Sequence, residues 1–315
     1  MQFRTEITLK TAPNSISYQD KIMLLGSCFS SNIGSVFKDK KFQVNINPFG
    51  VIYNPASICK SINTLIKNEK KEEKSLFFHQ GLWHSFSHHS SFSDISKTNT
   101  LHAINTSIEQ AHIDLKNASF LIITLGTAWI YESVDTQTVV ANCHKLADKN
   151  FIRRKLTVEE ITHNFSDTFE KLKKINPNIK IIFTVSPIRH WKDGAHENQI
   201  SKSTLFLAID KLRKNNLDID YFPAYEIMID DLRDYSFYKE DLNHPNQTAI
   251  QYIWKKLSET YFSKETIEIV KSIEKIQKAE MHKAFNPTSK EHLAFIRKTE
   301  QQKEELLKEY PFLKI

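Results

Sequence analysis

The chain has 315 residues, of which 40% are hydrophobic and 25% charged, a composition that allows a sizeable folded core and argues against general disorder. The net charge of +6 comes from basic residues scattered among acidic ones, so no nucleic-acid partner is expected. No run approaches the roughly 18 apolar residues of a membrane span, the polar N-terminus lacks a secretory signal, and three cysteines without CxxC spacing argue against disulfides and structural zinc, so a cytoplasmic protein without a membrane partner is expected.

Five short apolar runs, rich in β-branched residues, predict the strands of one sheet. In chain order they are Lys21–Gly26, 42–46, 119–126, 179–185 and a weaker run at 218–227. The third run is apolar on both faces, as a central parallel strand should be. Pro223 lies inside the fifth run, which places that strand at an edge or ends it there.

Helical patterns separate these strands. One apolar stripe consists of Ile104, Ile108, Ala111 and Leu115, and another of Ile161, Phe165, Phe169 and Leu172. The second stripe follows a capping box at Thr157 and Glu160. Strands that alternate with helices predict an α/β fold with a parallel sheet covered on both faces. In such sheets, functional sites form beyond the carboxyl ends of the strands.

Two segments depart from this alternation. The stretch at about 75–93 fits neither the helical nor the strand period, and we interpret it as a long irregular insertion. After about residue 263 two amphipathic helices follow, the second with a capping box expected at Thr288 and Glu291. The expected organisation is therefore a catalytic domain at 1–262 and a C-terminal helical extension at 263–315.

Two short motifs carry candidate chemistry. The first strand ends in Gly26-Ser27-Cys28, which places nucleophile-type residues at a turn. Far along the chain, Asp241 and His244 have the D-x-x-H spacing, in which one tight turn lets the carboxylate orient the imidazole. A nucleophile needs a base within hydrogen-bond reach, and the base needs a group that fixes its tautomer. Together the motifs predict nucleophilic catalysis with His244 as the base.

Several longer motifs resemble the GSCFA family, which is placed among the SGNH/GDSL-like hydrolases. They are GSCFS, NPFGVIYNP, TLGTAWIY, NCHK, TVSPIRHWKDG, YFPAYEIMIDDLRDYSFY and DLNHPN. The resemblance extends from about residue 21 to about residue 253. It implies a flavodoxin-like three-layer α/β/α sandwich, ester or acyl-transfer chemistry, and Asp241 and His244 as the orienting residue and the base.

The resemblance leaves two candidate nucleophiles. SGNH enzymes have Gly-Asp-Ser in the first block, and an alignment without a gap puts Cys28 at the serine position. A shift of one residue would instead put Ser27 there. A thiolate at a helix N-terminus beside the imidazole would suit acyl transfer, whereas a serine would match the hydrolase pattern. A third reading is that Cys28 merely fills space.

The resemblance also implies where an oxyanion would be held. The expected donors are the backbone N–H groups of the nucleophile and of Gly50, the glycine of the second block. The third block normally supplies an asparagine amide, but the chain has Gly126-Thr127-Ala128 there. Either Asn54 or Thr127 replaces that amide, or the oxyanion is bound more weakly.

Other polar residues are candidates for the pocket. Arg189 and His190 follow the fourth strand; Arg189 could hold a carboxylate or phosphate of the substrate, while packing roles are equally compatible. Asn142, Cys143 and His144 fit a surface turn better than a catalytic contact. His84, His88 and His89 lack carboxylate or cysteine neighbours at ligand spacing, so no metal and no cofactor are expected.

The function expected is an O-acyl ester hydrolase or acyltransferase that forms an acyl-enzyme. The substrate would be a small molecule or carbohydrate carrying an acyl group such as acetyl. The alternative is a non-catalytic binding or assembly module that keeps the fold, which the missing third-block asparagine favours. The oligomeric state is left open.

Overall fold

The computed structural model describes residues 5–215, 218–282 and 285–314. Its centre is a five-stranded, fully parallel sheet in the order β10-β9-β5-β1-β2. The strands are β1 (Lys21–Gly26), β2 (Gln43–Ile46), β5 (Phe120–Leu125), β9 (Lys180–Val185) and β10 (Ile219–Tyr221). All five predicted strands are thus confirmed, and β10 lies at an edge and ends before Pro223, as expected.

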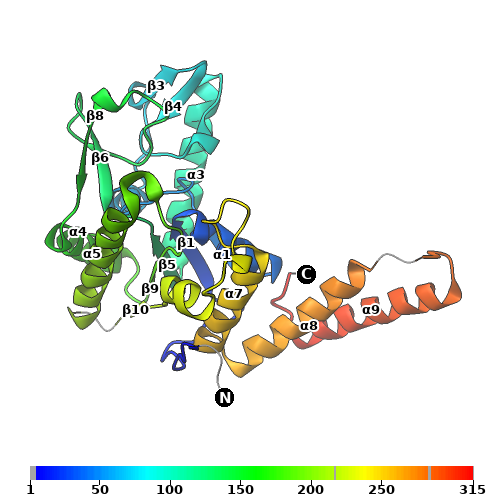
Figure 1. Cartoon of the computed structure of the whole chain (residues 1–315). Coiled ribbons are helices and arrows are strands. Elements are labelled where there is room, and N and C mark those ends of the chain that lie inside the picture. Colours follow the sequence, from blue (N-terminus) through cyan, green and yellow to red (C-terminus); the bar gives the residue numbers. More distant parts are fainter. Residues whose placement is uncertain (1–4, 216–217, 283–284, 315) are drawn as a thin grey trace.

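Helices cover both faces of this sheet, as Figure 1 shows. Successive side chains of a strand point to opposite faces, so Met23 and Leu25 pack in one core and Ile22 and Leu24 in the other. The first core is shared with α2 (Pro55–Lys67), α3 (Lys97–Asn117), α4 (Val158–Ile175) and α5 (Gly194–Asn215). The second is shared with α1 (Cys28–Asp39), α7 (Gln247–Tyr261) and α8 (Lys264–Glu280). The expected three-layer α/β/α sandwich is confirmed.

The strand order reverses between β1 and β5. From β1 the chain moves outward to β2 on one side, whereas β5, β9 and β10 follow on the other. In open α/β sheets a crevice forms at the carboxyl ends of the strands where the order reverses. Here that place lies between Gly26, at the end of β1, and Gly126, just beyond the end of β5.

The segment expected to be irregular contains a β-hairpin, so this interpretation was wrong. β3 (Leu76–His79) pairs in antiparallel fashion with β4 (Leu82–Ser85). The two-residue loop, Gln80 and Gly81, has positive φ at both positions, 47° and 81°, which is the turn that matches the twist of paired strands. A 3-10 turn, η2 (Ser90–Phe92), follows.

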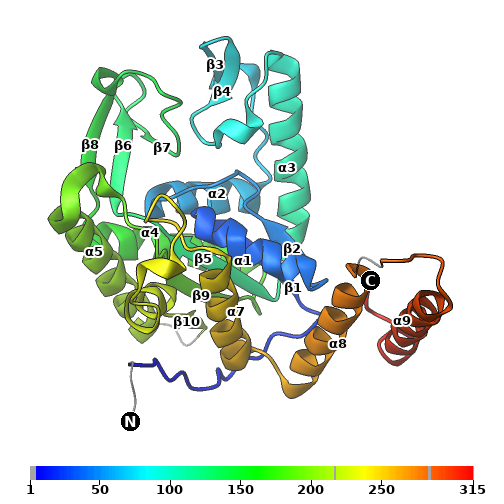
Figure 2. The ribbon, with the colours of Figure 1, turned by 45° about the vertical axis from the view of Figure 1, so that its right-hand side comes forward.

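A second antiparallel sheet was not predicted. It consists of β6 (Trp129–Ser133), β7 (Val139–Val140) and β8 (Phe151–Lys155), with β6 in the middle. Figure 2 shows this sheet and the β3–β4 hairpin as two projections on the same side of the molecule. Between β10 and α7 lie α6 (Ala224–Glu226), the π-helical turn η5 (Ile227–Asp231) and the loop that carries Asp241 and His244.

The C-terminal helices α8 and α9 (Lys290–Glu309) form a hairpin that extends away from the sheet in Figure 1. Helix α9 buries little, chiefly Thr299 and Leu306. Its N-cap is Ser289, which accepts from the His292 N–H at 3.1 Å, so the N-cap expected at Thr288 was wrong by one residue and Glu291 does not close a capping box. Within the described ranges, no helix is long and apolar enough to cross a membrane.

Candidate active site

The turn between β1 and α1 is built around Gly26. Its φ is +140°, and a Cβ at this position would lie 2.2 Å from the carbonyl oxygen of Thr124. The Gly26 N–H donates to Oδ1 of Asn47 at 2.8 Å, and the Ile52 N–H donates to the Gly26 carbonyl at 2.9 Å. Only glycine fits this close approach of two strands, so the start of α1 is held against the end of β5.

Ser27 and Cys28 differ in accessibility. Ser27 is the N-cap of α1 and is 1% exposed, and its hydroxyl has no hydrogen-bond partner. Cys28 is the first residue of the helix and is half-buried. A nucleophile has to reach a substrate from solvent, so the geometry of this turn favours Cys28 over Ser27.

The Cys28 thiol lies at the positive end of a helix. Burial raises its pKa, while hydrogen bonds from the backbone N–H groups of Cys28 and Phe29 act in the opposite direction, as do the charges of Lys202 and Lys239. The Ser27 side chain makes no capping hydrogen bond to these amides. The first turn of α1 therefore directs donors and its partial positive charge toward the sulfur.

His244 and Asp241 form the predicted dyad. Nδ1 of His244 lies 2.6 Å from Oδ2 of Asp241. Oδ1 of the same carboxylate accepts the backbone N–H groups of His244 at 2.8 Å and of Asn243 at 2.9 Å. These two backbone hydrogen bonds are the main reason that the pKa of Asp241 is lowered to about 2. The carboxylate stays ionised and leaves Nε2 of the imidazole as the proton acceptor.

Two of the expected oxyanion donors are already used inside the protein. The Gly50 N–H donates to the carbonyl of Asn47 at 2.7 Å. The Thr127 N–H donates to the carbonyl of Tyr53 at 3.1 Å, and its hydroxyl lies 3.0 Å from Oγ of Ser201. The expectation for Gly50 is therefore corrected, because its N–H is used inside the protein; the Thr127 N–H is used as well, and its hydroxyl is a hydrogen-bond partner of Ser201.

Asn54 retains a side-chain donor, because Nδ2 has no hydrogen-bond partner among the described residues. Its Oδ1 caps α2 by accepting the Ser57 N–H at 2.8 Å, which turns Nδ2 away from the helix. The preceding residue, Tyr53, accepts the N–H of Gly126 at 2.8 Å beyond the end of β5. Because Ile52 is bonded to the end of β1, the 52–54 segment bridges the two strand ends and places Asn54 beside the reversal point.

A buried lysine was missed in the sequence. Lys202 of α5 is 0% exposed, and its Nζ donates to the carbonyls of Gly126 at 2.8 Å and Ser186 at 2.7 Å. Burial lowers its pKa to about 7, and the charge of Cys28 opposes that shift. Lys202 thus joins the ends of β5 and β9 and places a cation near Cys28. One lysine in a polar helix gives no signal of this role.

Arg189 and His190 follow β9 and contact the loop of His244 and Tyr53, respectively. The Arg189 N–H donates to Oδ1 of Asn243 at 3.1 Å, which ties the segment after β9 to the loop of His244. The His190 ring meets the edge of Tyr53 with the centroids 5.5 Å apart. Burial, followed by repulsion from Lys202 and His244, lowers the pKa of His190 to about 4. His190 is therefore neutral at pH 7 and unsuited to the role of a cation.

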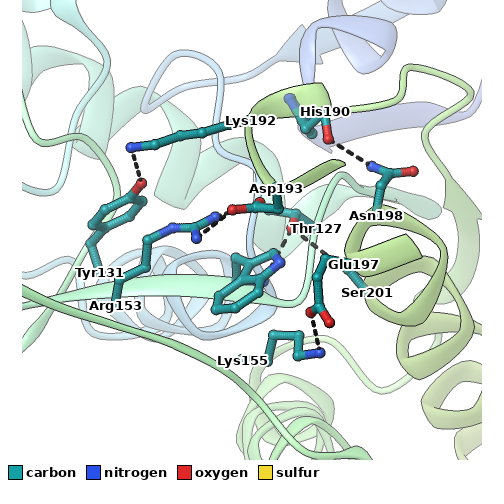
Figure 3. Close-up of polar contacts among 11 residues, drawn as sticks. Thr127, Tyr131, Arg153, Lys155, His190, Lys192, Asp193, Glu197, Asn198 and Ser201 are labelled. Atoms are coloured by element: carbon teal, nitrogen blue, oxygen red, sulfur yellow. Dashed lines mark hydrogen bonds and ion pairs between the residues drawn. The ribbon is translucent and has the colours of Figure 1, made fainter. Parts of the chain in front are cut away.

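The unpredicted β6–β8 sheet fixes this segment, as the close-up in Figure 3 shows. Arg153 of β8 makes a two-point ion pair with Asp193, at 2.6 Å and 2.5 Å. The His190 carbonyl accepts from Nδ2 of Asn198 at 3.3 Å. Two further pairs are Lys192 with Tyr131 at 3.0 Å and Lys155 with Glu197 at 2.7 Å. The antiparallel sheet therefore holds residues 190–198 in place beside the reversal point.

Charges act between the candidate residues, but the described hydrogen bonds do not connect these residues in one chain. The charge of Lys202 acts on both Cys28 and His190, and that of His244 acts on His190. Throughout the described part of the chain, the hydrogen bond of the His244 ring is with Asp241, and none joins it to Ser27 or Cys28. The base and the nucleophile therefore lie without a direct hydrogen bond between them among the described residues.

The histidines of the hairpin region are used in packing. Nδ1 of His84 lies 2.6 Å from Oγ of Ser93, and Nε2 of His144 lies 2.9 Å from the carbonyl of Ser85. Burial lowers the pKa of His88 to about 3, which keeps that ring neutral. These contacts join the β3–β4 hairpin to the turn at residues 142–145.

Some solved structures match the chain with little shared sequence. A carbohydrate esterase family 3 protein from Talaromyces cellulolyticus matches with 10% identity and a TM-score of 0.37, over 80% of this chain and 98% of its own. The acetyl xylan esterase Est2A from Butyrivibrio proteoclasticus matches with 12% identity and a TM-score of 0.40, over 78% and 64%. No protein with a curated description matches.

The sequence itself matches two family models. The model of the GSCFA family covers residues 21–257, and the model of the GSCFA domain protein, C-terminal domain, covers residues 273–315. The first match includes the Cys28 turn, the second strand end and the loop of His244. The chain therefore belongs to the GSCFA family.

Proposed function

We propose that this protein is an O-acyl ester hydrolase or acyltransferase in which Cys28 is the nucleophile, His244 the base and Asp241 the residue that orients the base. The observation that carries the proposal is the Asp241–His244 dyad, in which a carboxylate holds Nδ1 of the imidazole, in a chain that also places a half-buried thiol at the N-terminus of α1. Both lie on segments that leave the carboxyl-end side of the parallel sheet.

The raised pKa of Cys28 determines how the reaction starts. Because burial disfavours the thiolate, the thiol carries its proton at neutral pH and needs a base. Nε2 of His244 takes this proton as the sulfur attacks the acyl carbonyl, and the imidazolium is stabilised by Asp241. The imidazolium then returns the proton to the leaving alkoxide, and the acyl group stays on sulfur as a thioester.

Three groups would stabilise the oxyanion of the tetrahedral intermediate. The backbone N–H groups of Cys28 and Phe29 already face the sulfur, and Nδ2 of Asn54 is a side-chain donor at the strand ends. Lys202, whose charge acts on Cys28, adds positive charge without contacting solvent. Preorganised donors of this kind typically contribute about 2.7–4 kcal/mol each.

The second half of the reaction transfers the acyl group. Water, deprotonated by His244, gives a hydrolase, whereas a sugar or other hydroxyl gives a transferase. The SGNH-like motifs of the sequence support an acyl group such as acetyl, carried by a small molecule or a carbohydrate.

The direct test is hydrolysis of p-nitrophenyl acetate by the wild type, His244→Ala and Asp241→Asn. Loss of the base should lower kcat/KM by about 10²–10⁴-fold. Asp241→Asn should also lower it, because the imidazole tautomer is no longer fixed. His196→Ala, which changes an exposed histidine of α5, is the matched control and should leave the rate unchanged. Equal rates in all four proteins would exclude the proposal.

The second candidate is a binding module that keeps this fold without turnover. Two observations favour it: the N–H groups of Gly50 and Thr127 are already used inside the protein, and no hydrogen bond joins Cys28 to His244 among the described residues. A binding module would hydrolyse p-nitrophenyl acetate no faster than His244→Ala. The same assay therefore separates the two functions.

A further inference from the structure

A hollow of about 240 Å³ lies beside the loop of His244. Its lining includes Arg189, Trp191, Tyr235, Tyr238, Leu242 and Asn243. Leu242 and Asn243 come directly before His244, and Asn243 accepts the backbone N–H of Arg189 at 3.1 Å. The hollow therefore shares a wall with the candidate catalytic loop.

Arg189 brings a charge to this hollow that no acidic group neutralises. Its guanidinium stacks on Trp191, 4.6 Å from the ring centroid, and has one long contact, 3.5 Å from Nε to Oδ1 of Asn198. Among the residues that the structure describes, no carboxylate pairs with it. By contrast, Arg233, on the same wall, pairs with Asp230 at 2.6 Å. A half-buried guanidinium with free donors suits a carboxylate or a phosphate.

The other walls are aromatic and accessible. Trp191 is 51% exposed and Tyr235 is 72% exposed, although large aromatic side chains are usually buried. Tyr235 also lies against Tyr238, with the ring centroids 5.8 Å apart. The single carboxylate in the lining, that of Asp234, already accepts the Ser236 N–H at 2.7 Å. Flat apolar faces beside one guanidinium fit a ring-shaped organic anion better than a bare ion.

We propose that this hollow is the subsite for an anionic group of the substrate, so that the substrate is an acyl ester of an acidic sugar or a similar ring-bearing carboxylate or phosphate. This deepens the proposed function, on which it rests. Arg189 binds the anion, Trp191 and Tyr235 contact the ring, and the shared wall brings the ester of the same molecule toward His244.

The test measures binding by calorimetry, separately from catalysis. The protein is the full chain carrying Cys28→Ala, and the probes are glucuronate, glucose 6-phosphate and neutral glucose. Both anions should bind at least about tenfold more tightly than glucose, because a charged hydrogen bond is lost with the neutral sugar. Arg189→Gln should weaken both anions by a similar factor. Arg297→Gln, which removes an exposed charge from α9, is the matched control and should change neither.

The two anions distinguish the chemistry of the group: preference for glucuronate indicates a carboxylate, and preference for glucose 6-phosphate a phosphate. Arg189→Lys keeps the charge without the planar fork and should bind more tightly than Arg189→Gln. Equal affinity of Arg189→Gln and its parent for both anions would overturn the proposal. Loss of esterase activity alone would not overturn the proposal, because binding is measured without turnover. Intact anion binding in a protein that fails the p-nitrophenyl acetate assay would reject only the catalytic function.

Discussion

The two halves of the candidate site are held in different ways. The Cys28 turn is fixed by the core: Gly26 packs against Thr124, and the hydroxyl of Ser27 beside it is buried. The loop of His244 is held mainly by contacts within the loop and by one hydrogen bond from the Arg189 N–H to Asn243, and the side chains of His244 and Asp241 are 37% and 50% exposed. The nucleophile is thus placed by the whole sheet and the base by one turn. Substitutions in the Cys28 turn should lower the stability of the fold, whereas substitutions in the loop of His244 should lower only the catalytic rate.

Gly26→Ala should give the largest effect on stability. The added Cβ would meet a backbone oxygen at 2.2 Å in a backbone conformation that side chains rarely adopt. We expect the free energy of unfolding to fall by about 3 kcal/mol, measured by urea denaturation. Gly81→Ala is the matched control: its φ is also positive, +81°, but no atom lies within 4 Å of the new Cβ. It should cost only about 1–2 kcal/mol, the strain of the left-handed conformation. Equal losses in both variants would show that the Cys28 turn is not fixed by close packing.

Lys202 should give an effect on stability that depends on pH. Burial lowers its folded pKa to about 7, below the ordinary 10.5, so the unfolded chain binds more protons between these values. Stability from this group therefore rises with pH from 7 toward 10.5 and is lowest below pH 7. Two proteins that both carry Cys28→Ser are compared, one with Lys202 and one with Lys202→Met. The free energy of unfolding of the first should rise by about 1 kcal/mol per pH unit in this window relative to that of the second. The Cys28→Ser background, used in both proteins, removes the thiol that titrates nearby. If the free energies of unfolding of the two proteins changed with pH in the same way, the lowered pKa of the buried Lys202 would be contradicted.

The comparison of the two regions also explains what could be predicted from the sequence. The five strands and the Asp241–His244 contact follow from local patterns, namely apolar runs and a short spacing. The β3–β4 hairpin was missed because its loop is Gln80-Gly81, whereas the usual signal is Asn-Gly or Asp-Gly. Its strands also mix apolar and polar residues without strict alternation.

Tertiary contacts account for the remaining errors. Gly50 has the positive φ expected of a turn glycine, 72°, but only the fold reveals that its N–H is used by Asn47. Lys202 lies among polar residues of α5, and its burial depends on strand ends that come from distant parts of the chain. The position of Cys28 relative to His244 also depends on tertiary contacts, because more than two hundred residues separate them.

The most direct measurement of the central claim is the site of acylation. The wild type and Asp241→Asn are incubated with p-nitrophenyl acetate, quenched in acid and mapped by peptide mass spectrometry. We predict one acetyl group on Cys28, formed faster in the wild type, and none on Ser27. Cys143, which is also half-buried, serves as the internal control for non-specific acetylation. Acetyl on Ser27, or labelling of Cys28 no faster than that of Cys143, would contradict the account.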